Sequence, residues 1–224
     1  MAKLHTVRPH GKNIGYTSRD LLKQGRTYKF VRLLCALLIV AAIPSAGLAQ
    51  EPVVAMDATE KLSLHWNNTV SPLALVGVLG YAGLLQEMDS PREWRQGWDA
   101  YGKRVGSSLG ASVIHSGLAF GLDTALHQDP RYFRAKKGNW LKRAGHAVRG
   151  TILTKTDSGS ETFSTWRVGS AYGSAFLSNL WYPKRLDTFE LGVGQGSITL
   201  GFDLVKNLAT EFWPDLKRKL SPSK

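Results

Sequence analysis

The stretch Tyr101–Phe133 constrains the fold most, because it joins a long, weakly polar helical pattern to an abrupt charged stop. Gly102, Gly106 and Gly110 recur every four residues, so on a helix they share one side that carries almost no side chain. Each glycine inside a helix costs about 1 kcal/mol relative to alanine. Several glycines at this spacing therefore predict close packing of a second helix on this side, either in a membrane or in a soluble helical core.

The polar end of this stretch carries candidate chemistry. Asp123 and His127 are four residues apart and should share a helix face. Asp129-Pro130 should end the helix, because the residue before a proline avoids the α conformation. An arginine-aromatic cluster follows, formed by Arg131, Tyr132 and Phe133. Such a cluster is typical of a helix end at a membrane surface, and it would equally suit docking against a neighbouring helix.

The rest of the chain also favours helices. Ser71-Pro72 is a good helix start, because serine caps a helix and proline suits its first turn. The further helices are predicted over 73–85, 139–152, 164–181 and from 197 to 213. Alternation over 197–200 would also allow a strand, while the polar segment 154–162 is predicted to be a surface loop. The predicted fold class is all-α, a membrane-associated bundle of about five helices.

The predicted helix over 164–181 resembles the first one in design. Gly169 and Gly173 are again four residues apart and predict a second close-packing face. Trp181 and Tyr182 close this helix before a proline and two basic residues. We therefore expect these two aromatic side chains to act as interface or lipid anchors, like the cluster that begins at Arg131.

The start of the chain has the pattern of a secretory signal. Residues 1–32 are basic, and the apolar run Leu33–Ile43 is too short to span a membrane comfortably. Small residues around Ala49 suit a signal peptidase, so 1–49 is predicted to be a signal peptide or, if it is retained, an N-terminal anchor. A lead-in segment over 50–70 and a helical domain over 71–220 then complete the predicted organisation.

The charge distribution argues against nucleic-acid binding. The formal net charge is +12, but residues 1–32 contain eight Lys or Arg and one Asp and so hold most of it. The mature chain lacks a concentrated basic face with a reading motif, so its mild excess fits anionic lipid better. The single cysteine, Cys35, lies in the predicted signal and excludes a disulfide framework in the mature protein.

Two motifs carry a resemblance to a known group. The chain contains Asp129-Pro130-Arg131-Tyr132-Phe133 and, near its end, Glu211-Phe212-Trp213-Pro214-Asp215. Together with Trp181-Tyr182-Pro183 they resemble a group of uncharacterised bacterial envelope proteins, chiefly acidobacterial. The resemblance covers roughly 72–220 and implies a place in the cell envelope, but it implies no activity.

The sequence therefore favours an exported, membrane-associated protein on the periplasmic side of a bacterial envelope, with a structural or lipid-interacting role. The expected partners are membrane lipid and either a second copy or another envelope protein, without nucleic acid. The alternative is a membrane-embedded hydrolase or transferase that uses Asp123, His127 and His146, with His115 as a further imidazole. No metal or cofactor is predicted, because only Asp123 and His127 are held together by local geometry.

Overall fold

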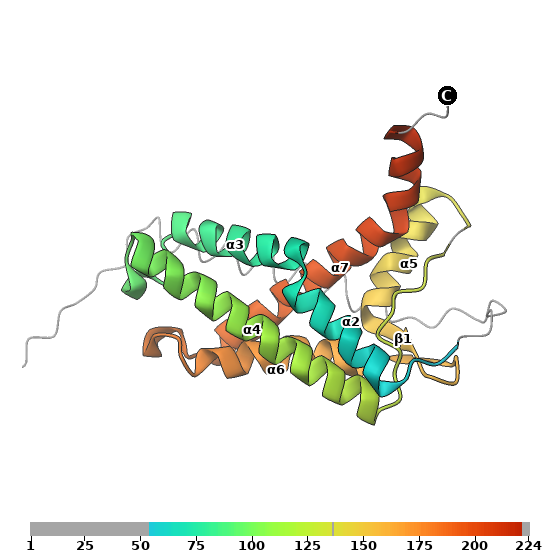
Figure 1. Ribbon diagram of the computed structural model, residues 1–224, viewed down its shortest axis with the longest axis horizontal. Helices are drawn as coiled ribbons and strands as arrows, with labels where there is room; N and C mark the ends of the chain where they lie inside the picture. Colours follow the sequence, from blue (N-terminus) through green and yellow to red (C-terminus); the bar gives the residue numbers. More distant parts are fainter. Residues whose placement is uncertain (1–53, 136, 221–224) are drawn as a thin grey trace, which may run out of the picture.

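The computed structural model describes residues 54–135 and 137–220 (Figure 1). Within these residues it contains six α-helices, two short 3-10 helices and one two-stranded hairpin. The prediction of an all-α bundle is confirmed, with one α-helix more than expected. The predicted signal segment 1–49 lies outside the described residues.

The first two helices form a bent pair. α2 (Ala58–Val70) begins with a capping box, in which the Asp57 carboxylate accepts from the Glu60 amide at 2.8 Å and the Glu60 carboxylate accepts from the Asp57 amide at 3.0 Å. The lead-in segment is thus helical over most of its length. Ser71-Pro72 then interrupts the chain, and α3 (Pro72–Glu87) continues at 45° to α2.

A buried arginine holds the turn between α3 and α4 (Trp98–Ala125). The 3-10 helix η1 (Arg92–Trp94) lies in this turn. The guanidinium of Arg104, in α4, donates to the carbonyl oxygens of Ser90 at 2.8 Å, Arg95 at 3.0 Å and Pro91 at 3.1 Å. A buried guanidinium is stable only when its N–H donors are hydrogen-bonded. These bonds supply the acceptors that Arg104 needs, and they also fix the loop between α3 and α4.

The end of α4 differs from the prediction. The helix ends at Ala125, before the expected stop at Asp129-Pro130. The physical reason is His127, which takes a left-handed backbone conformation with φ of 51°. A residue in that conformation cannot continue a right-handed helix, so His127 leaves the helix face that Asp123 occupies.

The segment after α5 (Trp140–Ile152) is a hairpin where a surface loop was expected. β1 (Leu153–Lys155) pairs antiparallel with β2 (Glu161–Phe163), and Thr154 lies opposite Thr162. The polar turn residues occupy only the connection between the strands, where Gly159 takes a positive φ of 89°. The prediction of a loop over 154–162 was therefore wrong at both ends.

The last helix is longer than predicted. After α6 (Thr165–Asn179) and η2 (Lys184–Leu186), α7 (Phe189–Leu220) starts before residue 197 and continues through Pro214. Proline removes the helix hydrogen bond to the Thr210 carbonyl. At the next carbonyl, that of Glu211, Arg143 and Arg134 donate from outside the helix, at 2.5 Å and 3.1 Å, and stabilise this turn. The strand alternative over 197–200 is excluded.

The helices pack in an antiparallel succession. α3 and α6 both lie along α4, and α7 crosses α6 and then continues beside α5 (Figure 1). Tyr101 in α4 donates to the Leu79 carbonyl in α3 at 3.1 Å, while Trp181 after α6 donates to the Ser107 hydroxyl in α4 at 2.9 Å. The bundle thus has one centre, which is surrounded by the bent pair α2–α3, by α4, by α6 and by the first half of α7.

The interior is built from small and polar side chains. Most of the buried apolar residues are alanines: Ala82, Ala100, Ala119, Ala147, Ala171 and Ala175. The large apolar side chains of α3 are instead exposed, with Leu73 at 82% and Val76 at 63%. This distribution is the reverse of the usual one in water-soluble proteins, where large aliphatic side chains fill the core.

The two glycine faces have different surroundings. A Cβ at Gly169 would lie 2.8 Å from Leu122, and one at Gly173 would lie 2.9 Å from Leu118, so α6 approaches α4 closely at both positions. Above Gly102 and Gly106 the space is open to 4 Å, and Gly110 meets only Trp181, at 4.0 Å. The predicted packing of another helix on the α4 glycines does not occur within the described chain, because α6 lies against a different side of α4.

Among the residues that the structure describes, one helix has by itself the length and composition to cross a membrane. α4 meets this criterion by itself, and 11% of its apolar window is buried inside the protein. The bent pair α2–α3 meets it when both helices are taken together.

Candidate functional site

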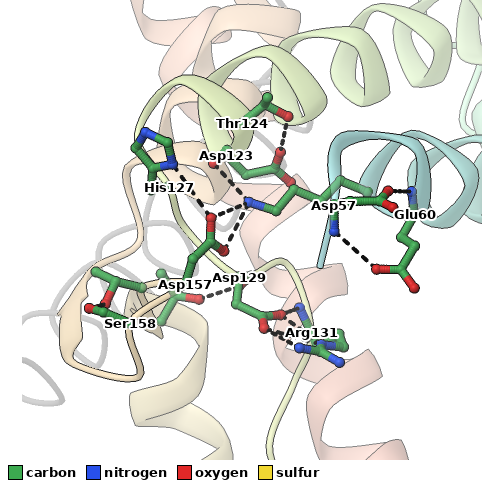
Figure 2. A network of polar contacts seen from close by, with 12 residues as sticks. Asp57, Glu60, Asp123, Thr124, His127, Asp129, Arg131, Asp157 and Ser158 are labelled. Carbon is green, nitrogen blue, oxygen red and sulfur yellow. Dashed lines mark hydrogen bonds and ion pairs between the residues drawn. The ribbon is translucent and has the colours of Figure 1, made fainter. Parts of the chain in front are cut away.

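A buried polar cluster lies where α4 ends, between α2 and the hairpin (Figure 2). The fully buried Asp123 carboxylate is 2.6 Å from Nε2 of His65, which comes from α2. The ammonium group of Lys61, one turn before His65, lies 3.0 Å from both carboxylate oxygens of Asp157 and donates to the Asp123 carbonyl at 3.4 Å. We call Lys61, His65, Asp123 and Asp157 the Asp123 cluster. It joins three separate elements through charged hydrogen bonds.

The three predicted catalytic residues have separate partners. His127 is 82% exposed, and its Nδ1 faces Asp157 at 3.7 Å rather than Asp123 (Figure 2). Nε2 of His146 is 2.7 Å from the Phe133 carbonyl, with its ring beside Tyr132. The expectation that Asp123 and His127 share a helix face was wrong, because α4 ends between them.

Sequence reasoning missed His65, the actual partner of Asp123. A signal was present in α2, where Lys61, His65 and Thr69 recur every four residues. All three are buried, so they form one inward polar stripe. Thr69 extends the stripe toward α4, with its hydroxyl 2.5 Å from that of Ser116.

The arginine-aromatic cluster Arg131–Phe133, which follows α4, makes its contacts with neighbouring segments of the protein. Arg131 binds the buried Asp129 carboxylate through two nitrogens, at 2.9 and 2.5 Å (Figure 2). Hydrogen bonding to Asp129 raises the pKa of Arg131 above its ordinary value. The Phe133 ring lies under two cations, with Lys155 at 4.5 Å and Arg131 at 5.6 Å. Of the two interpretations of this cluster, the contacts favour docking against neighbouring segments.

The segments Asp129–Phe133 and Glu211–Asp215 meet in space. The Tyr132 hydroxyl donates to a Glu211 carboxylate oxygen at 3.0 Å, across 79 positions of the chain. The same carboxylate accepts from the Ala135 amide at 3.0 Å and from Nε of Arg143 at 2.8 Å. Arg143 also binds Asp215, the last residue of the second segment. These residues form a second polar cluster, which we call the Glu211 cluster.

The Glu211 cluster favours an ionised carboxylate. Burial raises the pKa of Glu211, but hydrogen bonds from Arg143, Ala135 and Tyr132 outweigh burial and bring the pKa below its ordinary value. Hydrogen bonding to Arg143 also lowers the pKa of Asp215. Burial, followed by the bond to Glu211, raises the pKa of Tyr132. At neutral pH the cluster is therefore a carboxylate pair clamped by a cation and a neutral phenol.

The opposite end of the bundle carries aromatic side chains. The indole of Trp181 donates to Ser107 at 2.9 Å, and the ring of Tyr182 lies 5.3 Å from that of Trp94. Trp98, at the start of α4, is 87% exposed. Arg185 and Glu93 form an ion pair at 2.7 Å in the same region. The predicted anchors Trp181 and Tyr182 thus lie among other aromatic and charged groups.

Between the two ends, the packed helices contain no Asp, Glu, Lys or Arg. The charge-free runs are 62–86 in α2–α3, 105–122 in α4, 168–183 in and after α6, and 191–202 in α7. Lys61, Asp123, Arg167 and Asp203 bound them at one end. Glu87, Arg104, Lys184 and Glu190 bound them at the other. The run in α4 is about 27 Å long at 1.5 Å per residue. We call this region the charge-free layer.

A central cavity of about 350 Å³ lies inside the charge-free layer. Side chains from α2, α3, α4, α6 and α7 line it, and no Asp, Glu, Lys or Arg of the described residues is among them. His115 lines the cavity from α4, and its Nδ1 is buried without a hydrogen-bond partner. The cavity is thus uncharged, and its largely apolar lining carries hydroxyl, amide and imidazole groups.

The described residues contain no group of three or more His, Cys, Asp or Glu that could hold a metal ion. Comparison of the chain with protein-family models, with curated proteins and with solved structures finds no match.

Proposed function

We propose that this chain is an exported helical protein of the bacterial cell envelope, embedded in a membrane through its charge-free layer and serving a structural or lipid-interacting role. The observation that carries the proposal is that the four charge-free runs lie side by side at the same level of the bundle. Because the runs belong to helices packed antiparallel, their bounding charges collect at two ends of the bundle.

The dimensions of this layer support the proposal. The run in α4, about 27 Å long, approaches the roughly 30 Å of a bilayer's hydrocarbon core. The runs in α6 and α7 are shorter, and aromatic side chains flank one end of the layer, at Trp98, Trp181 and Tyr182. Tryptophan and tyrosine favour the boundary between lipid and water.

The distribution of side chains supports the same proposal. α3 carries no charge before Glu87, and most of its leucines and valines are exposed, while the bundle buries alanine, serine and charged pairs. In water, such a surface would be an exposed apolar patch with a high tendency to aggregate. In lipid, the large side chains contact acyl chains and the small ones allow close helix packing.

Fractionation of cells that express the full chain tests membrane embedding. We expect the protein to remain in the membrane pellet after a carbonate wash, because the wash removes peripheral proteins that bind by charge. Complete release into the supernatant would contradict embedding. N-terminal sequencing of the recovered protein tests export separately, because a mature chain that starts near residue 50 requires processing of the predicted signal peptide.

A further inference from the structure

Hydroxyl groups supply several of the hydrogen-bonding atoms that line the central cavity. Five of its hydroxyls donate to a carbonyl of their own helix: Thr69 to His65, Ser112 to Ser108, Ser174 to Ala171, Ser178 to Ser174, and Thr199 to Gln195. A hydroxyl has one donor and two acceptor positions. The O–H donors of these five hydroxyls are already used. Their oxygen atoms can therefore only accept hydrogen bonds from an occupant of the cavity.

The lining also includes the side-chain amides of Asn68 and Gln195, which can donate as well as accept, together with an imidazole and an aromatic pair. Nδ1 of His115 is buried without a partner and would accept or donate one further bond, according to its tautomer. Tyr81 and Phe202 pack edge to face at 6.0 Å and give the cavity an aromatic wall. With no charged side chain of the described residues lining it, the cavity would not compensate the desolvation of an ionic ligand.

We propose that the central cavity is a binding site for a small uncharged polyhydroxy molecule or group. Such a ligand brings several O–H donors to the acceptor-rich hydroxyls, and the C–H face of a ring polyol suits the aromatic wall. A volume of about 350 Å³ lies at the lower end of the range for ligand sites, which restricts the ligand to one small ring. A free polyol and the neutral sugar headgroup of a glycolipid share this chemistry.

The test uses the full chain purified in detergent or reconstituted in nanodiscs. One arm measures binding of myo-inositol by saturation-transfer NMR, with glucuronate as the charged comparison. The other arm measures binding of a monoglucosyl diacylglycerol in nanodiscs. We expect saturable binding of at least one neutral probe and none of glucuronate. Binding only in the second arm would identify a lipid headgroup as the source.

Single-site variants connect the binding to the cavity. Ser178→Ala removes one buried acceptor, and loss of one hydrogen bond should weaken binding roughly two- to tenfold. Thr199→Val is the second variant, in case the first does not fold. Ser63→Ala, which removes an exposed hydroxyl of α2, is the matched control and should leave affinity unchanged. Absence of saturable binding by both neutral probes, or binding that neither cavity variant weakens, would overturn the proposal in favour of a cavity that holds only water.

Discussion

Nε2 of His65 lies 2.6 Å from the Asp123 carboxylate, so α2 and α4 are joined by one fully enclosed hydrogen bond between residues 58 positions apart. The bond lies beside the ion pair of Lys61 with Asp157, which connects the same corner to the hairpin. Three elements that are distant in sequence therefore depend on one polar corner at the boundary of the charge-free layer.

The first prediction concerns this bond. Asp123→Ala should lower the free energy of unfolding by about 3 kcal/mol, because it leaves His65 buried without its partner. Chemical denaturation of the purified protein in detergent measures the change. Asp99→Ala, at an exposed position in the first turn of the same helix, is the control and should change stability by about 0.5 kcal/mol or less. Equal effects of the two substitutions would mean that the His65–Asp123 bond does not stabilise the fold.

The second prediction is a dependence of stability on pH that originates in the Glu211 cluster. The pKa of Glu211 is lower in the folded chain than its ordinary value, so the folded state favours the ionised carboxylate. This stabilisation is complete above the unfolded pKa of about 4.3 and is lost as the pH falls through the lower folded pKa. Asp215 contributes with the same sign. Thermal unfolding between pH 7 and pH 3 should therefore show a falling melting temperature at the acid end.

Substitution separates Glu211 from the other carboxylates. Glu211→Gln should lower stability at pH 7 and flatten the decline at acid pH, because the amide cannot ionise. Glu190→Gln, at an exposed position at the start of the same helix, should retain the decline. A Glu211→Gln profile parallel to that of the unmodified protein would show that the decline arises elsewhere.

Much of the helical pattern could be predicted from local signals. Ser71-Pro72 and Asn139 cap α3 and α5, and both helices begin within one residue of their predicted starts. The hairpin was missed because three-residue strands have little periodicity of their own and depend on pairing with each other. The C-terminal end of α7 was predicted too early because Pro214 is a local stop signal. In the structure Arg143, which belongs to α5, stabilises the turn before this proline.

The candidate site was predicted only in part, for a similar reason. Asp123 was recognised as a polar position that would bond either His127 or a neighbouring helix, but the residue on that neighbouring helix was not identified. The actual partner, His65, is reached only through packing of α2 on α4, which spacing along one helix does not encode. The left-handed conformation of His127 is a further property that periodicity cannot indicate.

The third prediction compares two glycines that sequence alone would treat alike. A Cβ at Gly196 would lie 2.3 Å from the Tyr172 ring, whereas one at Gly106 would meet nothing within 4 Å. Gly196→Ala should therefore lower stability by about 1 to 3 kcal/mol through overpacking. Gly106→Ala should raise it by up to about 1 kcal/mol through helix propensity. Denaturation of the protein purified in detergent measures both, and a loss of stability in Gly106→Ala would show that another chain packs on α4.

The last prediction tests whether α3 contacts hydrocarbon. Val76 is 63% exposed near the middle of the charge-free run 62–86, so in water Val76→Arg would change stability by about 0.5 kcal/mol or less. At the centre of a membrane helix an arginine costs about 2.5 to 3.5 kcal/mol, because the charge must be removed from water. We therefore expect Val76→Arg to reduce the share of protein that resists a carbonate wash. Leu220→Arg, at an exposed position of α7 beyond the charge-free layer, is the matched control and should behave like the unmodified chain. Full retention of Val76→Arg in the washed membrane would mean that the exposed side of α3 faces water, and its row of leucines and valines would then require a protein partner.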